Sequence, residues 1–389
     1  MAEGEAAPPR VRRPVVAMVF KYLVHHRKPF CEHLRDQLDA HGIDLRLIHG
    51  QPGPEDAPRQ DAGELTWACR IRNMVIPLGR RELFWQPALP LLHGADLVVV
   101  NDASKLLLNY VLFLQQVLGR RRIALLGHGF NARRRPGTRP GEWMKGVISR
   151  QAHWWFAYND VSAAAVERLG FPRDRITSIH NAIDTRALVA ARDAVTAAQL
   201  ETLRSALQIR GSNVGLFVGG MYEDKLLPLL IAACRLIREA IPDFEMIFLG
   251  AGSDEGIVRA AAAEHPWIHY LSPRFESDKV PYCMLAKVLL LPGAVGLTVL
   301  DSFALQLPLV TIADRYHGPE IAYLETEVNG VILPASTGPK AYAEEVVRLL
   351  RDESRMARLR DGCARASAVY TAEEMARRFA DGLVLALTR

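Results

Sequence analysis

The 389-residue chain lacks several features that would place it in a large protein class at once. Its five cysteines form no C-x-x-C pair, which argues against a zinc site and a disulfide framework and indicates a reducing compartment. No apolar run approaches the roughly 20 residues of a membrane-spanning helix, and the first residues hold no apolar segment of a secretory signal. We therefore expect a cytoplasmic protein whose membrane contact, if there is any, is peripheral and at the inner face of the plasma membrane.

The motifs of several catalytic and binding sites are absent as well. The sequence contains no G-x-x-x-x-G-K-[ST] phosphate loop, no G-x-S-x-G elbow, no H-E-x-x-H zinc motif and no D-x-D metal pair. The stretch GAGSDEG at 250–256 lacks the G-x-G-x-x-G spacing of a dinucleotide turn. No known module for nucleic-acid recognition is evident. The sequence thus gives no reason to expect a metal, a nicotinamide cofactor or a nucleic-acid partner.

The composition is typical of a globular protein with more than one domain. Apolar residues make up 49% and charged residues 23%, which allows sizeable buried cores. A length of 389 residues is enough for two or three domains. The formal net charge of +5 permits an anionic substrate or a membrane surface but requires neither.

Short apolar runs alternate with amphipathic stretches along the whole chain. Several runs are almost continuously hydrophobic, as expected for strands buried on both faces. Between them lie helical patterns, such as the one that places Phe30, Leu34 and Leu38 on one face. The alternation predicts parallel sheets covered by helices. The runs span 14–20, 44–50, 95–101, 122–129, 154–160 and 176–181 and, after a polar segment, 213–220, 245–252, 268–272, 287–293, 308–314 and 330–335.

This pattern predicts an α/β protein with two doubly wound, Rossmann-like domains that face each other across a cleft. We expect a disordered arm at 1–13, an N-terminal domain at 14–185 and a C-terminal domain at 186–370. A final helix at 371–389, capped by Thr371, should pack back toward the N-terminal domain. Ligands of such sheets bind beyond the carboxyl ends of the strands, so functional residues should follow the strands and line the cleft.

One candidate site is the stretch PGAVGLTVLD at 292–301, which directly follows an apolar run. Gly296, Leu297 and Thr298 would lie at the start of a helix, where free backbone N–H groups attract an anion such as phosphate. Asp301 would lie in the first turns of that helix. The alternative is a structural turn in which Asp301 only complements the helix dipole.

Other candidates also follow predicted strands. Lys225 comes after Gly219 and Gly220, and it would either pair with a diphosphate or point into solvent. Glu320 opens a helical stretch, where it would accept hydrogen bonds from sugar hydroxyls or simply begin a helix. His128 ends a predicted strand and precedes a glycine. It would either face the cleft or be a structural histidine.

A basic segment follows His128 and contains Arg133, Arg134, Arg135 and Arg139, with Trp143 and Met144 nearby. It would either stay solvated or touch an anionic lipid or an anionic acceptor. The sequence does not separate these two outcomes.

Together these stretches resemble glycosyltransferase family 4, whose members have two Rossmann-like domains in the GT-B arrangement. The resemblance covers most of the chain, and four segments carry it. IHNAIDTRAL at 179–188 is similar to the family's Asn-Gly-Val-Asp interdomain segment, and LFVGGMYEDK at 216–225 to its Val-Gly-Arg-x-x-x-x-Lys loop. The stretch at 292–310 resembles its motif of two acids with seven residues between them. HGPEIAYLETEVNGVIL at 317–333 resembles the loop, helix and Asn-Gly strand that close the donor domain.

The resemblance implies a retaining, metal-independent transferase that needs no cofactor, binds a nucleotide-sugar in the C-terminal domain and binds an acceptor against the N-terminal domain. Lys225 would match the diphosphate-binding lysine, the backbone of 296–298 the diphosphate cradle, and Asp301 the acid that usually holds the ribose. Glu320 would lie near the sugar, and His128 would line the sugar and acceptor pocket. Further candidates are Gly219, Gly220 and Arg274 on the donor side and His25, His26, Arg27, Asp102 and Asn131 on the acceptor side.

The chain departs from the family's pattern at the donor site. Gly220 stands where the family commonly has an arginine beside the phosphates, and Gly293 stands where the first acid should be. The second acid is Asp301, one methylene shorter than glutamate. The N-terminal loop FKYLVHHRKPF, usually rich in glycine, offers the cations of 25–28 as replacements, and Glu320 is the candidate replacement for the first acid. The donor sugar therefore stays open.

The leading hypothesis is a hexosyltransferase-type glycosyltransferase of bacterial polysaccharide, glycoconjugate or secondary-metabolite synthesis. Its acceptor would be a glycan, a lipid-linked intermediate or a small molecule. The candidate catalytic residues are His128, Lys225 and Glu320, with leaving-group stabilisation by the amides of 296–298. Two alternatives remain: a nucleotide-sugar epimerase on the same scaffold, and a non-catalytic protein that binds a nucleotide-sugar, which Gly220 and Gly293 would explain.

Overall fold

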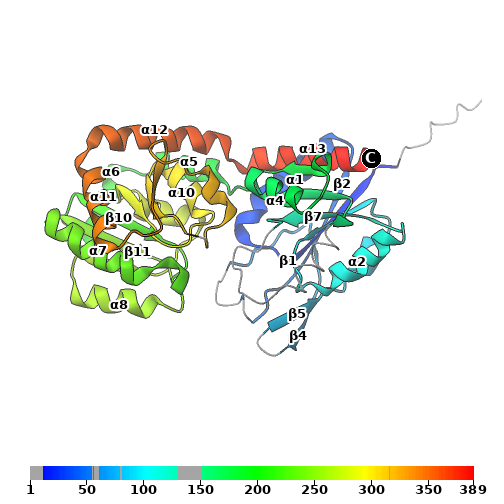
Figure 1. The fold of residues 1–389 in the computed structure, drawn as a ribbon, viewed down its shortest axis with the longest axis horizontal. Helices are drawn as coiled ribbons and strands as arrows, with labels where there is room; N and C mark the ends of the chain where they lie inside the picture. The colour runs from blue at the N-terminus through cyan, green and yellow to red at the C-terminus, as the bar shows by residue number, and fades with distance from the viewer. Residues whose placement is uncertain (1–11, 55, 57–60, 79–80, 130–149, 315) are drawn as a thin grey trace, which may run out of the picture.

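The computed structural model describes residues 12–389 except 55, 57–60, 79–80, 130–149 and 315. Over these residues the chain forms two parallel β-sheets, each covered by helices, which lie next to each other in an elongated molecule (Figure 1). The first sheet has seven strands and the second has six. The predicted α/β fold with two doubly wound domains is confirmed.

The N-terminal sheet has the strand order β3-β2-β1-β6-β7-β8-β9. The inner strand β1 pairs in parallel with β2 and β6, so Val16 lies between Leu45 and Leu97. Residues 16–19 are buried, which explains why this run is hydrophobic at every position instead of alternating. The elements of this domain are β1 (Val15–Tyr22), η1 (His25–Arg27), α1 (Lys28–Ala40), β2 (Asp44–Gly50), β3 (Cys69–Arg70), η3 (Leu89–Leu92), β6 (Leu97–Asn101), α2 (Leu107–Val117), β7 (Arg122–Gly127), β8 (Trp154–Ala157), α4 (Asp160–Arg168), η4 (Arg173–Arg175) and β9 (Ile176–Ser178).

The C-terminal sheet has the order β12-β11-β10-β13-β14-β15, with β10 between β11 and β13. Every residue of β11 is buried, which agrees with a run that is apolar at every position except Glu245. All the apolar runs of the sequence therefore contain strands. The elements are α5 (Thr185–Ala194), α6 (Ala197–Ala206), β10 (Asn213–Val218), η5 (Glu223–Lys225), α7 (Leu227–Ala240), β11 (Phe244–Leu249), α8 (Glu255–Glu264), β12 (Ile268–Leu271), η6 (Glu276–Lys279), α9 (Val280–Cys283), β13 (Val288–Leu290), α10 (Thr298–Leu305), β14 (Leu309–Ile312), η7 (Pro319–Tyr323), β15 (Gly330–Leu333), α11 (Pro339–Arg351) and α12 (Glu353–Val369).

The last helix, α13 (Ala372–Thr388), lies against the N-terminal domain (Figure 1). The side chain of Thr371 accepts a hydrogen bond from the backbone N–H of Glu374 at 3.1 Å and so caps the helix. The ring of Phe379 stacks on Phe156 of β8 with 3.9 Å between ring centroids. Gly382 lies so close to the N-terminal sheet that a Cβ there would be 2.5 Å from Thr177 Oγ1. The chain therefore starts and ends in the same domain.

The expected arm at the N-terminus falls mostly on residues 1–11, outside the described part of the chain. Arg12 and Arg13 are described and lie against the N-terminal domain. Arg13 pairs with Asp39 at 2.6 Å, and Arg12 pairs with Asp96 at 3.2 Å. Both pairs are exposed to solvent and contribute little to stability.

An antiparallel hairpin, β4 (Met74–Leu78) and β5 (Arg81–Trp85), was missed by the sequence analysis. It forms a separate two-stranded sheet at the margin of the N-terminal domain (Figure 1). Met74, Ile76 and Leu78 share its outer face and are exposed. Because β4 (MVIPL) is apolar at every position, it lacks the alternation of a half-buried strand and carries apolar side chains on its exposed face as well.

The two domains meet through buried polar groups. Asn159, which caps α4, donates from Nδ2 to the carbonyl oxygen of Pro319 at 2.5 Å. Asn181 donates from Nδ2 to Glu320 Oε1, also at 2.5 Å. The hydroxyl of Tyr323 donates to the carbonyl oxygen of Asn181 at 3.3 Å. These bonds fix η7 of the C-terminal domain against the ends of β8 and β9.

Across the described residues, no helix combines the length and the apolar character that a membrane span requires.

Candidate functional site

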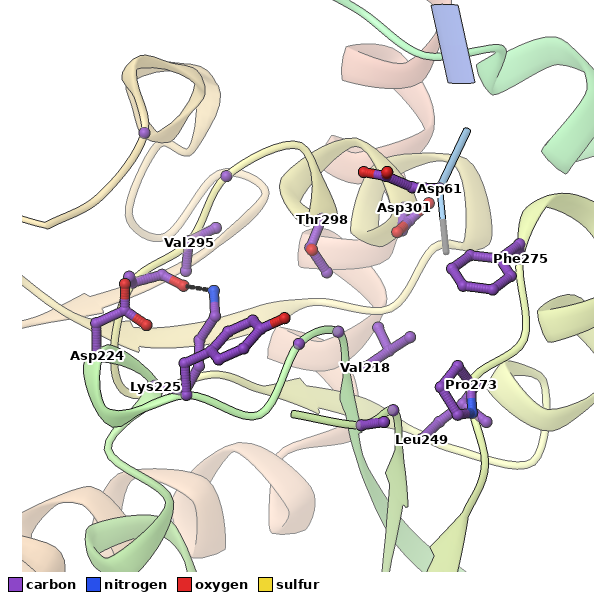
Figure 2. Close-up of a pocket in the computed structure, with 18 of the residues that line it drawn as sticks. Asp61, Val218, Asp224, Lys225, Leu249, Pro273, Phe275, Val295, Thr298 and Asp301 are labelled. Atoms are coloured by element: carbon purple, nitrogen blue, oxygen red, sulfur yellow. Dashed lines mark hydrogen bonds between the residues drawn. The ribbon is translucent and has the colours of Figure 1, made fainter. Parts of the chain in front are cut away.

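A cleft of about 820 Å³ lies between the carboxyl ends of the two sheets and is lined by both domains. Figure 2 shows Asp224 and Lys225 at one end of the cleft, Pro273 and Phe275 at the other, and Thr298 between them. The C-terminal domain supplies most of the walls, through the loops that follow β10, β11, β12, β13 and β14. This is the place where parallel α/β sheets bind ligands.

The loop before α10 is held from behind by a buried histidine. Nδ1 of His317 accepts a hydrogen bond from the backbone N–H of Val295 at 2.9 Å, and its Nε2 donates to the carbonyl oxygen of Ile312 at 2.8 Å. This pairing fixes one neutral tautomer, and burial lowers the pKa of His317 below its ordinary value. The N–H of Gly318 donates to the carbonyl oxygen of Val295 at 2.7 Å. The loop therefore has little freedom.

The next three backbone N–H groups are left open at the start of α10. Among the described residues, the N–H groups of Gly296, Leu297 and Thr298 have no hydrogen-bond acceptor. A Cβ added at Gly296 would meet no atom within 4 Å, so its backbone borders open space. Unpaired N–H groups at a helix start carry partial positive charge and favour an anion. Gly296 and Thr298 line the cleft, as the anion hypothesis requires.

Lys225 lies beside this helix start. Its Nζ donates to the carbonyl oxygen of Ala294, and the N–H of Ala294 donates to the carbonyl oxygen of Asp224 at 2.7 Å (Figure 2). Lys225 ends the short η5 turn, and α7 begins after Leu226 in the left-handed conformation, with φ of 54°. The lysine thus stands at the cleft with its ammonium group against the 292–298 loop.

Gly293 is a site of close backbone approach. A Cβ at this position would lie 2.2 Å from the carbonyl oxygen of Asp224 and 2.6 Å from the carbonyl carbon of Lys225. Any side chain here would displace the 222–226 loop, because these contacts are with main-chain atoms. The absence of an acid at 293 therefore follows from the position of this loop.

Gly220 also lies in close contact, in this case with the ring of Tyr222. A Cβ at 220 would lie 2.4 Å from Cε2 of Tyr222. The ring of Tyr222 lines the cleft and is 39% exposed, so it has room to contact a ligand. The ring of Tyr222 occupies the space that the first atoms of an arginine side chain at position 220 would need.

Asp301 is held by a lysine that the sequence analysis missed. Nζ of Lys279, at the end of η6, lies 2.6 Å from Oδ1 of Asp301, and both side chains are largely buried. The pair borders the cleft and also a second cavity of about 350 Å³. No motif of the sequence marks Lys279 as a site residue. Its contact with Asp301 is formed only when the chain folds.

Glu320 is placed differently from the prediction. Its side chain does not line the cleft; it is 4% exposed and accepts the hydrogen bond from Asn181 at the domain junction. Burial raises the pKa of Glu320 above its ordinary value, and the bond from Asn181 partly offsets this rise. Through Oε1 this carboxylate joins the two domains, while its Oε2 lies beside Gly318, a residue of the cleft wall.

Two sequence models of known protein families match the chain. The model described as Glycosyltransferase Family 4 matches residues 30–187, and the one described as Glycosyl transferases group 1 matches residues 212–352. Together they cover about three quarters of the sequence. The chain belongs to the family 4 glycosyltransferases.

Solved structures place this glycosyltransferase in the GT-B fold. HepE from Anabaena, in complex with UDP-glucose, superposes with a TM-score of 0.68 at 14% identity, over 95% of this chain and 99% of that one. A glycosyltransferase from Rickettsia africae gives 0.69 at 13% identity, over 97% and 98% of the two chains. A UDP-N-acetylglucosamine 2-epimerase gives 0.60 at 14% identity, over 96% of each. No curated protein matches the chain in sequence.

On the donor side of the glycosyltransferase, most of the predicted residues meet at the cleft. Gly219, Gly220, Lys225, Arg274, Gly296, Thr298 and Asp301 all line it. Leu297 instead lines the second cavity.

The acceptor side is brought together only in part. His25 and His128 line the cleft, whereas His26 lines the second cavity, and Arg27 and Asp102 line neither. Burial, together with Arg27, lowers the pKa of His26 to about 3, so this side chain is neutral and supplies no positive charge. Asn131, the four arginines of the basic segment, Trp143 and Met144 lie outside the described residues.

His25 and His128 approach the cleft from different strands of the N-terminal domain. Nδ1 of His25 lies 3.2 Å from Oε1 of Glu276, and its ring lies 5.2 Å from that of Phe275. These contacts reach from one domain to the other. The ring of His128 follows β7 and packs edge-on against Tyr158 at 4.4 Å.

A carboxylate at 61 also faces the cleft, and the sequence analysis did not include it. Oδ1 of Asp61 accepts a hydrogen bond from the hydroxyl of Tyr22 at 3.1 Å, and the carbonyl oxygen of Asp61 accepts one from the N–H of His25 at 2.8 Å. Asp61 follows no apolar run, so strand-end reasoning had no means of finding it. Among the described residues, no cluster of three or more His, Cys, Asp or Glu side chains has the arrangement of a metal site.

Proposed function

We propose that this glycosyltransferase moves a sugar from a nucleoside-diphosphate sugar to an acceptor hydroxyl, with retention at the anomeric carbon and without a metal. The observation that carries the proposal is the set of unpaired N–H groups of 296–298, of which Gly296 and Thr298 line the cleft beside Lys225. A diphosphate placed there would receive N–H hydrogen bonds and the charge of one ammonium group. Such donors act most strongly when negative charge develops on the leaving group.

The other cleft residues suggest how the donor would lie. Asp301, held by Lys279, would accept hydrogen bonds from the ribose hydroxyls. Arg274 and Phe275 lie beyond it and would contact the base. The sugar would then point toward His128 and the N-terminal domain. HepE from Anabaena has been crystallised with UDP and UDP-glucose, which supports a uridine diphosphate sugar as the donor class.

The transfer step needs no carboxylate nucleophile in this scheme. As the bond between the anomeric carbon and the diphosphate oxygen breaks, the acceptor hydroxyl attacks from the same face. Its proton passes to the departing diphosphate, whose charge the 296–298 amides and Lys225 stabilise. His128, at the acceptor side of the cleft, would orient the hydroxyl. Glu320 takes no part, because its carboxylate is bound to Asn181.

The test is a thermal-shift panel with UDP, GDP, ADP, dTDP and CDP, each with and without magnesium. A diphosphate at about 100 times its dissociation constant should stabilise the protein by roughly 2.7 kcal/mol. We expect one of them to do so without magnesium. Lys225→Ala should lose most of that shift and most transfer activity. A panel in which no diphosphate shifts the wild-type protein would contradict the proposal.

The acceptor is proposed to be a glycan, a lipid-linked intermediate or a small molecule of bacterial glycoconjugate or secondary-metabolite synthesis. The transferred sugar is proposed to be a hexose, and the site of action the cytoplasm or the inner face of the plasma membrane. Product analysis with candidate acceptors and the donor named by the thermal-shift panel would test each of these points.

An epimerase is the second candidate, because a UDP-N-acetylglucosamine 2-epimerase has the same fold. It would convert the donor without any acceptor. Incubation with UDP-N-acetylglucosamine alone, followed by NMR of the sugar, separates the two functions: a new epimer supports the epimerase, and an unchanged donor supports the transferase.

A further inference from the structure

Helix α2 of the N-terminal domain is apolar on its exposed face as well as on its buried face. Leu108, Leu112 and Phe113 are buried in the core. On the other side, Leu114 and Val117 are 60% and 65% exposed. Tyr110 and Leu118 are exposed on the same side, and residues 106–118 include no charged residue. A surface helix of a monomeric soluble protein normally presents polar side chains to water, so this face marks an interaction site.

The β4–β5 hairpin repeats this inversion next to α2. Directly paired residues of two antiparallel strands point to the same side, and Met74 pairs with Trp85 and Ile76 with Leu83. These four residues therefore form one apolar face, which Leu78 extends at the position paired with Arg81. Met74 and Leu78 are about as exposed as Leu114. The other face carries Phe84, which is fully buried and whose N–H bonds to the loop before α2. The hairpin thus turns an apolar face outward as well as one inward.

Positive charge lies at the end of α2. Arg120, Arg121 and Arg122 follow the helix after Leu118 and Gly119, and none of the three pairs with a carboxylate among the residues that the structure describes. Arg121 donates to Gln115 Oε1 and to the carbonyl oxygen of Leu92, and Arg122 donates to that of Leu387. Arg120 is exposed. An exposed apolar helix face beside arginines offers both contacts that an anionic lipid surface provides, apolar burial and attraction to negative headgroups.

We propose that α2 and the β4–β5 hairpin dock the protein on a membrane surface that carries anionic lipid headgroups. The apolar side chains would enter the boundary between headgroups and acyl chains, and the arginines would contact the headgroups. Tyr110 suits this boundary because its ring is apolar and its hydroxyl is polar. Neither element borders the cleft, and α2 lies at the edge of the N-terminal domain farthest from the C-terminal domain (Figure 1). Docking would leave the cleft open.

Self-association through α2 fits the charges less well. In a two-fold pair the same surface of each copy faces the other. The arginines that follow α2 in each copy would then lie in the same interface and repel each other, because α2 has no acidic residue to pair with them. An anionic surface instead complements both the apolar face and the arginines. The proposal does not depend on the sugar-transfer reaction; if that reaction also holds, docking of the N-terminal domain favours an acceptor carried by a lipid.

The test is flotation of the full-length protein with vesicles of phosphatidylcholine alone and of phosphatidylcholine with 30% phosphatidylglycerol, about the charge of an anionic membrane. We expect binding to the anionic vesicles that weakens as salt rises. The double variant Leu114→Glu/Val117→Glu should bind at least about tenfold more weakly, because two apolar side chains are lost from the interface. Arg120→Glu should weaken binding to the anionic vesicles and should not change the result with vesicles of phosphatidylcholine alone.

The matched control is Val369→Glu/Leu385→Glu, which changes two exposed apolar residues on α12 and α13. It should bind like the wild type. Circular dichroism and the diphosphate thermal shift confirm that each variant is folded, and they report on the donor site separately from vesicle binding. Absence of wild-type binding to anionic vesicles overturns the proposal. So does equal binding by the α2 variant, or a dimer in light scattering that Leu114→Glu/Val117→Glu dissolves.

Discussion

At the scale of single residues, two glycines decide the shape of the donor end of the cleft. Gly220 leaves space for the ring of Tyr222, and Gly293 leaves space for the main chain of Asp224 and Lys225. In the family's pattern these two positions carry an arginine and an acid. Both replacements are therefore linked to the position of one loop, 222–226. Packing explains them without the assumption that the site has lost its function.

Gly293→Glu, which restores the family's acid, should destabilise this chain. The new side chain meets main-chain atoms of the 222–226 loop, and overpacking of this kind costs about 1–3 kcal/mol. Displacement of Lys225 should also weaken diphosphate binding. Urea unfolding and the thermal shift measure the two effects. Gly256→Ala in α8, where a Cβ meets no atom, is the control and should not destabilise. Full stability of Gly293→Glu would show that the loop moves freely.

The pair of Lys279 and Asp301 is a second feature at this scale, and it gives a separate prediction. Lys279→Met leaves the buried carboxylate without its cation, which should lower the free energy of unfolding by about 3 kcal/mol. In Lys279→Met/Asp301→Leu no buried charge is left unpaired, so stability should recover while diphosphate binding stays weak. Chemical denaturation and titration with the diphosphate check both. Normal nucleotide affinity in the double variant would contradict the ribose role of Asp301.

At the scale of elements, helix starts carry most of the site. At the α10 start, His317 accepts a hydrogen bond from the N–H of Val295, and the N–H of Gly318 donates to the carbonyl oxygen of Val295. These bonds hold the loop in place, and the next three N–H groups have no acceptor among the described residues. The α7 start is set by Leu226, a leucine in the left-handed conformation that glycine adopts more readily. Local strain at Leu226 therefore accompanies the position of Lys225 at the cleft.

Leu226→Gly should relieve this strain. A left-handed residue with a Cβ costs roughly 1–2 kcal/mol, and the greater freedom of glycine in the unfolded chain offsets part of the gain. We expect a net stabilisation of up to about 1 kcal/mol, read as a rise in melting temperature. Leu226→Ala keeps the Cβ and should not stabilise. If both variants behave alike, the conformation at 226 carries no strain.

At the scale of the whole molecule, the two domains are joined by buried polar contacts as well as by the chain. Asn159 and Asn181 reach from the N-terminal domain to Pro319 and Glu320, and α13 returns to the N-terminal domain. Glu320 is therefore a joint between domains. Because its pKa is raised by burial, protonation favours the folded state, and this contribution is lost as the pH rises through the raised pKa.

Glu320→Gln tests this joint through its pH dependence. The amide oxygen of glutamine can still accept the bond from Asn181, but it cannot ionise. The free energy of unfolding of the variant minus that of the wild type should be smallest below pH 4.5, the ordinary pKa of a glutamate, and should grow as the pH rises above it. Urea unfolding from pH 4 to pH 8 measures this difference. A difference that does not change with pH would show that Glu320 ionises without cost.

Much of the donor side could be predicted from sequence because each part is local. The 292–301 stretch and Lys225 follow apolar runs directly, so strand-end reasoning brings them to one edge of a sheet. Lys279 and Asp61 follow no such signal, and Glu320 follows one but is buried at the domain junction. The hairpin was missed because β4 is apolar on its exposed face as well as on its inner face and so shows no alternation.

The sequence by itself determined the two parallel sheets, their order along the chain and the helix starts at the cleft, because hydrophobic runs and turn residues act over a few neighbouring positions. Only the tertiary structure decided which side chains meet. Lys279 reaches Asp301, Glu320 reaches Asn181, and the 222–226 loop lies on Gly293. These contacts join residues far apart in the chain, so their geometry is set by how the sheets, helices and domains pack.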